Sequence, residues 1–343
     1  MRARIRQHHD LDLPPHPRFA GFEAFAAREI FPWLVGKEAE RRRTVQRVAY
    51  IIAGTAGAIA AMQLLAFAVV GTRQPVLVIV FFGLVPAVIG GAIAYFLVRQ
   101  FRADLKDFLL PKVCDRLKLR YMGSSSQLRI ADFAATGMLP SHNRHSLEDG
   151  IESEQTGTVF HAAEARLVKS TQTSKGPDNK NVWRGLLMAA RSARPFDGLT
   201  LVMPAQGFIT RLFGDRPHER IDLGFAELDS GLEVRTTLPE EARRVLNLQV
   251  MKSLAELARR LGHDRPSLAL MGEHVLLAVA TKRDRFEAGS LFKPLDDPQR
   301  IQDLLWELAH LCDLAEALGA ALKLERARTK APNAETSHPR KDA

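Results

Sequence analysis

Two adjacent uncharged apolar runs, residues 48–71 and 75–98, most strongly constrain how this chain of 343 residues can fold. Each run is 24 residues long, and only Thr72, Arg73 and Gln74 separate them. A helix rises about 1.5 Å per residue and the hydrocarbon core of a bilayer is about 30 Å thick, so about 20 apolar residues suffice to cross it. The sequence therefore predicts a transmembrane hairpin whose two helices have these bounds.

Basic residues flank the hairpin at both outer ends, whereas the turn between the runs carries only Arg73. The flanking arginines are Arg41, Arg42, Arg43 and Arg47 before the first run, and Arg99 and Arg102 after the second. Under the positive-inside rule, this asymmetry predicts a multi-pass protein of the cell inner membrane with both termini in the cytoplasm. A secretory signal is not indicated, because a second span follows the first run at once.

Small residues recur at every fourth position within both runs, a spacing that lets helix backbones approach closely in lipid. They are Ala53, Gly57 and Ala61 in the first run, and Gly83, Ala87 and Gly91 in the second. Two interpretations stay open: packing of the hairpin on itself, and contact with another copy in a homo-oligomer. Neither run contains Asp, Glu, Lys, Arg or His, residues that mark ion pathways in transporters. We therefore expect the hairpin to act as a tether.

The regions outside the hairpin define the expected domain organisation. Residues 1–17 are expected to form a disordered leader, and residues 18–47 an amphipathic juxtamembrane helix. Residues 101–324 are expected to form a cytoplasmic domain, and residues 325–343 a disordered basic tail. Phe22, Phe25 and Trp33 give the juxtamembrane helix an aromatic side. This side fits either the lipid headgroup layer or packing on the cytoplasmic domain, and the sequence does not decide between them.

The cytoplasmic domain is predicted to have an α+β fold, with a mainly antiparallel sheet and covering helices. Short apolar segments are separated by Gly, Pro, Asn or Asp without intervening helices, which is typical of antiparallel strands. The expected strands cover residues 157–170, 182–191, 199–204, 220–225 and 232–236, with two more within 268–281. The polar residues 171–181 predict a loop between the first two strands. Helices are expected over residues 237–261, with Asn247 as a point of division, and from Asp297 to about residue 324.

One weak candidate for metal chemistry is the group His142, His145, Glu148 and Asp149. The spacing lacks a helical His-Glu-x-x-His pattern and a distant third ligand, so a polar surface loop is the favoured interpretation. The sequence has no phosphate-binding glycine loop and no nucleophile elbow, so we expect no catalytic residue, cofactor or metal. Nucleic acid is not an expected partner, because the basic residues cluster beside the membrane runs rather than among exposed aromatic residues.

Several short segments occur in a characteristic order along the chain. They begin at Phe22, Phe133, Asn143, Trp183, Phe196, Leu232, Glu241 and Phe286. In this order they resemble an uncharacterised family of bacterial two-span membrane proteins whose cytoplasmic part is a domain of unknown function. The resemblance implies a membrane-anchored cytoplasmic domain without an established activity, ligand or catalytic residue. His145 stands where the family pattern has an aromatic residue, which counts against a metal pair with His142, whereas Glu148 and Asp149 fit the pattern.

These observations favour a non-enzymatic module that interacts with an unidentified protein or senses the membrane. The first alternative is a membrane-tethered enzyme with dispersed catalytic residues. That hypothesis would gain if Glu148, Asp149, Arg184 and Arg220 met in one pocket with perturbed pKa values. The second alternative is a lipid-binding module built on the antiparallel sheet and its covering helix.

Overall fold

The computed structural model describes residues 11, 13, 15–71, 76–153, 159–174, 176–204, 219–225, 232–260, 266–281, 291, 294, 295 and 297–329. Most of the expected leader, the turn around Arg73 and the tail after Thr329 lie outside the described residues. Contacts divide the chain into two compact units. The first combines Met1–Arg116 with Phe286–Leu305, and the second combines Leu117–Arg285 with Trp306–Ala343.

The first unit begins with short helical turns that lead into one long helix. These elements are η1 (Pro17–Phe19), α1 (Phe22–Phe25), the π-helical turn η2 (Ala26–Ile30) and α2 (Phe31–Val70). Pro32 lies in the first turn of α2, where proline is tolerated because its missing N–H would have no helical partner. The second half of the expected juxtamembrane helix and the first apolar run therefore form one continuous helix.

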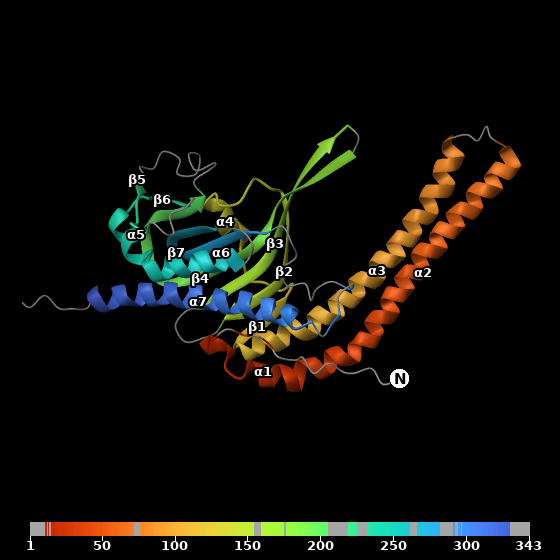
Figure 1. The fold of residues 1–343 in the computed structure, drawn as a ribbon. Coiled ribbons are helices and arrows are strands. Elements are labelled where there is room, and N and C mark those ends of the chain that lie inside the picture. Colours follow the sequence, from red (N-terminus) through yellow and green to blue (C-terminus); the bar gives the residue numbers. More distant parts are fainter. Residues whose placement is uncertain are drawn as a thin grey trace, which may run out of the picture. The chain divides into compact units, whose positions relative to one another are not determined.

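The second apolar run lies within another long helix, α3 (Val76–Arg116), which continues through Pro86 and Pro111. Figure 1 shows α2 and α3 side by side as a hairpin. Both helices are long and apolar enough to cross a membrane, and large apolar side chains such as Leu64 and Phe96 are exposed on them. These features confirm two long apolar helices and support membrane association.

The seam between α2 and α3 runs along residues spaced by three or four. On α2 the less exposed positions include Val48, Ile51, Thr55, Ile59, Met62 and Ala66. The closest approach is at Gly90, where an added Cβ would lie 2.1 Å from the Thr55 Oγ1 atom. Ala53, Gly57, Ala61, Ala87 and Gly91 are instead exposed, and only Gly83 of the expected small-residue rows is partly buried. The structure thus places most of these rows outside the seam.

In the part of the second unit that the structure describes, a seven-stranded sheet forms in which every strand pair is antiparallel. The strands are β1 (Leu119–Gly123), β2 (Arg144–Ser153), β3 (Phe160–Thr173), β4 (Gly176–Pro204), β5 (Glu219–Ile221), β6 (Leu232–Thr236) and β7 (Ser267–Ala280). Their order is β1-β2-β3-β4-β6-β5, and β7 also pairs with β4. The predicted α+β fold with a mainly antiparallel sheet is therefore confirmed.

Strand β4 is longer than the sequence indicates. It joins the expected strands 182–191 and 199–204 by means of register shifts between Arg191 and Leu199. The expected loop over residues 171–181 is wrong, because the β3–β4 ladder continues as far as Thr173 and resumes at Gly176. The two strands expected within 268–281 form the single strand β7, in which Gly272 has a φ of 54°.

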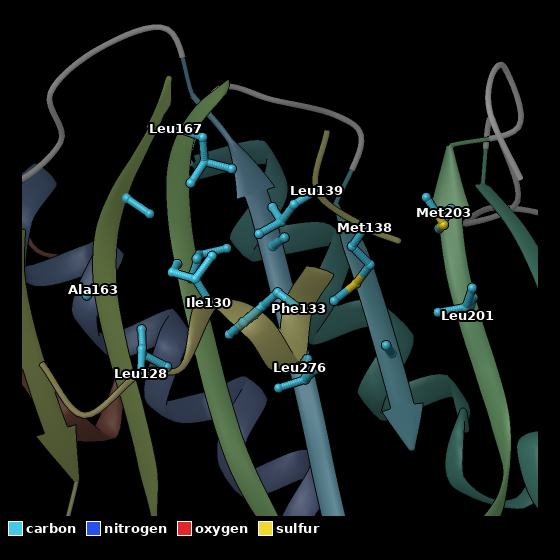
Figure 2. Packing of buried hydrophobic residues seen from close by; sticks show 14 of the residues in the cluster. Leu128, Ile130, Phe133, Met138, Leu139, Ala163, Leu167, Leu201, Met203 and Leu276 are labelled. Atoms are coloured by element: carbon cyan, nitrogen blue, oxygen red, sulfur yellow. The ribbon is translucent and has the colours of Figure 1, made fainter. Parts of the chain in front are cut away.

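Both faces of the sheet are covered by helices. The helices of this unit are α4 (Ile130–Ala135), α5 (Pro239–Val245), α6 (Leu248–Arg260) and the larger part of α7 (Pro298–Thr329). Figure 2 shows Ile130 and Phe133 of α4 against one face, with α6 and α7 behind the strands. Phe133 is fully buried and packs in a cluster with Leu167, Leu187 and Leu276. This apolar cluster packs α4 and the segment after it on one face of the sheet.

Candidate functional site

The four metal-ligand candidates lie at the start of β2 and in the segment before it, but they do not converge. The His142 and His145 rings are 6.2 Å apart, and His142 Nδ1 donates to the Pro140 carbonyl at 2.9 Å. Glu148 is exposed, whereas Asp149 is buried and accepts a 3.0 Å hydrogen bond from the Tyr121 hydroxyl. Within the described ranges, no group of three or more His, Cys, Asp and Glu residues is placed to hold a metal ion.

The residues of the enzyme hypothesis are also held apart by the sheet. Glu148 and Asp149 lie on β2, Arg184 lies on β4, and Arg220 lies on β5 at the other end of the strand order. Arg184 Nε donates to the buried Glu164 carboxylate at 2.9 Å. Arg220 is exposed on the edge strand. The structure therefore does not bring these four side chains into one site.

A more closely connected group of charges lies in the first unit, centred on Glu38 of α2. Arg41 donates to both oxygens of the Glu38 carboxylate, through Nη2 at 2.7 Å and Nε at 2.8 Å. Arg42 Nε adds a third hydrogen bond at 3.0 Å. The spacing of one helical turn places these residues on one side of α2. The Glu38 and Arg41 side chains are only 16% and 12% exposed, so solvent screens this pair less than an ordinary surface pair.

Both members of this pair also bind the backbone of a distant segment. Leu295 N–H donates to Glu38 Oε2 at 3.2 Å, and Arg41 Nη1 donates to the Leu291 carbonyl at 2.8 Å. The Leu291 and Leu295 side chains are buried. Arg300 lies close enough to Glu38 and Arg41 to interact electrostatically with both. We call Glu38, Arg41, Leu291 and Leu295 the Glu38 cluster.

Electrostatics show how firmly the Glu38 carboxylate is held. Hydrogen bonds from Arg41, followed by those from Leu295 and Arg42, lower the pKa of Glu38 from 4.5 to about 2, although burial acts in the opposite direction. Burial also lowers the pKa of Arg300. A carboxylate that accepts four hydrogen bonds and stays ionised down to such low pH is unsuited to proton transfer near neutral pH. The cluster is suited to holding two chain segments together.

The aromatic side of the juxtamembrane segment packs within the same unit. Trp33 stacks on Phe108 of α3, with ring centroids 3.7 Å apart and planes 8° from parallel. Lys112 of α3 forms an ion pair with Glu29 at 3.3 Å, and this contact lowers the pKa of Glu29. Phe22 is fully buried. The segment thus packs on the extension of the second apolar helix, within the first unit.

The basic flank of the hairpin has mixed surroundings. Arg41 is bound within the Glu38 cluster, and Arg42 contributes from its edge. Arg43, Arg47 and Arg99 are exposed, whereas Arg102 is partly buried. Sequence reasoning found these arginines but missed Glu38, Leu291 and Leu295. The spacing of Glu38 and Arg41 would have indicated a pair on one helix turn, but no local pattern points to residues about 250 positions away.

Comparisons with known proteins find a match to a protein family whose function is unknown. Residues 181–320 match the family described as "Protein of unknown function (DUF3137)", and this match confirms the resemblance to an uncharacterised family. No curated protein matches the chain. Among solved structures, the chain is similar to the crystal structure of the mycobacterial trehalose monomycolate transport factor A, TtfA, with 10% identity and a TM-score of 0.31. That match covers 60% of this chain and 96% of the other. A similarity at this level carries no inference about activity.

Proposed function

We propose that this chain, whose residues 181–320 match a family of unknown function, is a membrane-anchored sensor without catalytic chemistry. The hairpin lies in the bilayer, and the Glu38 cluster passes movements of α2 to α7. The observation that carries the proposal is the pair of backbone contacts from Glu38 and Arg41 to Leu295 and Leu291. These contacts fix the segment immediately before α7 to the base of the first membrane helix.

Helix α7 supports the proposal because its residues fall in both compact units. Residues 298–305 group with the hairpin, and the helix from Trp306 onward groups with the sheet. Ile301 and Leu305 are buried in the first part, and Leu308 and Cys312 are buried in the second. Shifts of packed helices are a common way to transmit a change between parts of a protein. A displacement of α2 would move the start of α7. Because α7 is one helix, this movement would reach its second part, from Trp306 onward.

The dispersed chemistry of the described residues favours a sensor over an enzyme. Glu148 and Asp149 lie on β2, Arg184 lies on β4 and Arg220 lies on β5, and only Asp149 of the two carboxylates is buried. The Glu38 carboxylate, whose pKa is lowered to about 2, is occupied by Arg41, Arg42 and Leu295. Neither arrangement offers a nucleophile beside a general base, which covalent catalysis requires.

The sensor hypothesis includes the orientation that the basic flanks predict. Both flanks lie on the cytoplasmic side of the inner membrane, and residues 101–324 form the cytoplasmic part. Exposed small residues on the hairpin, such as Gly57 and Gly91, leave a surface on which a second copy or a membrane partner can pack closely. A homo-oligomer or an unidentified protein partner therefore belongs to this proposal.

The proposal can be tested by changing the bilayer rather than the protein. The full chain is reconstituted into vesicles of phosphatidylcholine with shorter or longer acyl chains, which impose different tilts on membrane helices. Hydrogen exchange is then measured for residues 306–321 of α7. We expect exchange there to differ between the two bilayers.

Two variants show whether the Glu38 cluster carries the change. Glu38→Gln should abolish the difference between the bilayers in residues 306–321. Glu40→Gln should preserve it, because Glu40 is on the same helix and its ion pair among the described residues is with the partly exposed Lys37 at 2.7 Å. Equal exchange of the unaltered protein in both bilayers would refute the proposal, and so would a response that survives Glu38→Gln unchanged.

A further inference from the structure

Strands β3 and β4 extend beyond the neighbouring strands as a two-stranded ribbon (Figure 1). Its ladder runs from the pair Val168 and Asn181 to the pair Thr173 and Gly176. The base of the ribbon is fixed by Asn143, whose side chain donates to the Ser170 carbonyl at 2.7 Å and accepts from the Ser170 N–H at 2.8 Å. This amide takes the place of a neighbouring strand. The ribbon is therefore a built extension of the sheet.

The base of the ribbon carries two pairs of like charges directly opposite each other. Arg166 lies opposite Arg184, and Lys169 lies opposite Lys180. Like charges in such cross-strand positions destabilise a sheet. Arg144 on β2 lies opposite Val168, so it shares a face with the arginine pair, because side chains alternate along a strand. The lysine pair points to the other face.

Most of this positive charge has no acidic partner among the described residues. Arg184 is bound to Glu164 at 2.9 Å. Among the residues that the structure describes, Arg144, Arg166, Lys169 and Lys180 form no ion pair, and all four are exposed. The exposed acidic side chains nearest in register are Glu148, opposite Glu164, and Asp178, opposite Thr171. On the same strands, Asp149 and Glu152 are buried and bound to Tyr121 and Arg120, and Asp197 lies beyond the register shift that follows Arg191. We call Arg144, Arg166, Lys169, Arg184 and Lys180 the basic ribbon.

We propose that the basic ribbon binds the phosphate headgroups of anionic phospholipids. An anion placed between two opposed cations relieves their repulsion, and guanidinium groups match phosphate oxygens in a two-pronged geometry. The inference rests on the proposed membrane anchoring, because a tethered domain meets headgroups at high effective concentration. A basic side chain near an anionic surface contributes about fivefold to binding. Four exposed cations therefore suffice for a selective response to headgroup charge.

The test compares the full chain in vesicles of phosphatidylcholine alone and in an equal mixture of phosphatidylcholine and phosphatidylglycerol. Hydrogen exchange is followed in peptides covering residues 160–184. We expect slower exchange of this segment in the anionic vesicles, and loss of that slowing at high salt, because salt screens exposed charges.

Paired variants identify the residues responsible. Lys169→Gln with Lys180→Gln, and separately Arg144→Gln with Arg166→Gln, should each reduce the lipid-dependent slowing at least severalfold. Both remove opposed or crowded like charges, so neither is expected to weaken the fold. Arg191→Gln is the matched control, because Arg191 is exposed on β4 but is paired with Glu273 at 2.9 Å, and this variant should leave the effect unchanged.

The outcomes separate this inference from the sensor proposal. Equal exchange of residues 160–184 in neutral and anionic vesicles would overturn headgroup binding, even if α7 still responds to bilayer thickness. Headgroup binding would also be overturned if hydrogen exchange of this segment slowed only when an acidic protein or a nucleic acid was added, and not in phosphatidylglycerol vesicles. Conversely, a headgroup effect without a thickness effect would support the basic ribbon and count against transmission through the Glu38 cluster.

Discussion

Replacing Glu38 by Gln tests the Glu38 cluster most directly. The substitution preserves the size of the side chain and leaves one oxygen that can accept the Leu295 N–H, but it removes the charge that Arg41 binds through two hydrogen bonds. Arg41 is 12% exposed, so water compensates only in part. The variant should therefore loosen the segment around Leu295 without unfolding the hairpin.

The magnitude follows from the pKa of Glu38. Its lowering from 4.5 to about 2, at 1.36 kcal/mol per unit, corresponds to about 3 kcal/mol of favourable interaction with the ionised form. Solvent at the exposed edge of the cluster reduces this value to about 2 kcal/mol. A loss of that size should increase the local opening of the segment about 30-fold. An ordinary surface ion pair would give only about twofold to fivefold.

Hydrogen exchange of peptides that contain Leu295 measures this opening. Glu40→Gln is the matched control, because the Glu40 carboxylate is 48% exposed and should give at most a small change. If both variants raise exchange around Leu295 equally, the Glu38 cluster does not hold the segment and the reasoning fails.

The pH dependence of this opening supplies a second check. Because the pKa of Glu38 is lowered in the folded state, its stabilisation is present above about pH 4.5 and is lost as the pH falls towards 2.

Two further predictions concern the hairpin. Gly90→Leu should separate the two helices and lower the melting temperature of the detergent-solubilised protein, because a Cβ at Gly90 would clash with Thr55 Oγ1 at 2.1 Å. Gly91→Leu is the control, because a Cβ at Gly91 would meet no neighbouring atom within 4 Å. Equal melting temperatures of the two variants would contradict the proposed seam. A reporter that is active only outside the cytoplasm should stay silent when fused after Ala343, and activity there would overturn the orientation predicted from the basic flanks.

The hairpin is the part of the fold that the sequence predicts best, because the length of an apolar run is itself the physical requirement for crossing a membrane. The sheet is predicted in kind but not in detail. Pro195 and Gly198 suggest that one strand ends and another begins, yet register shifts between Arg191 and Leu199 absorb both residues within β4. Bulges of this kind depend on the pairing of the strand with its neighbours, which local composition does not contain.

The candidate sites were beyond sequence reasoning for a related reason. The Glu38 cluster requires Leu291 and Leu295 to meet α2, and that contact is made only in the folded chain. The basic ribbon requires the register that sets Arg166 opposite Arg184, and a shift by one residue would place the same charges on different faces. The small-residue rows show that a regular spacing does not by itself locate the closest contact between the helices. Their spacing is regular, but Thr55 and Gly90, which lie outside the rows, form the close approach.

We propose that the basic flank of α2 acts at two different stages. In the orientation that the positive-inside rule predicts, Arg41, Arg43 and Arg47 count as positive charges during insertion, and an acidic neighbour such as Glu38 contributes little. In the folded protein Arg43 and Arg47 stay exposed, whereas Arg41 lies beside buried Leu291 and is bound to Glu38. Without that carboxylate, Arg41 would be a largely buried cation without a counter-charge, which costs on the order of several kcal/mol. Glu38 therefore allows one arginine of the basic flank to become part of the folded core of the first unit.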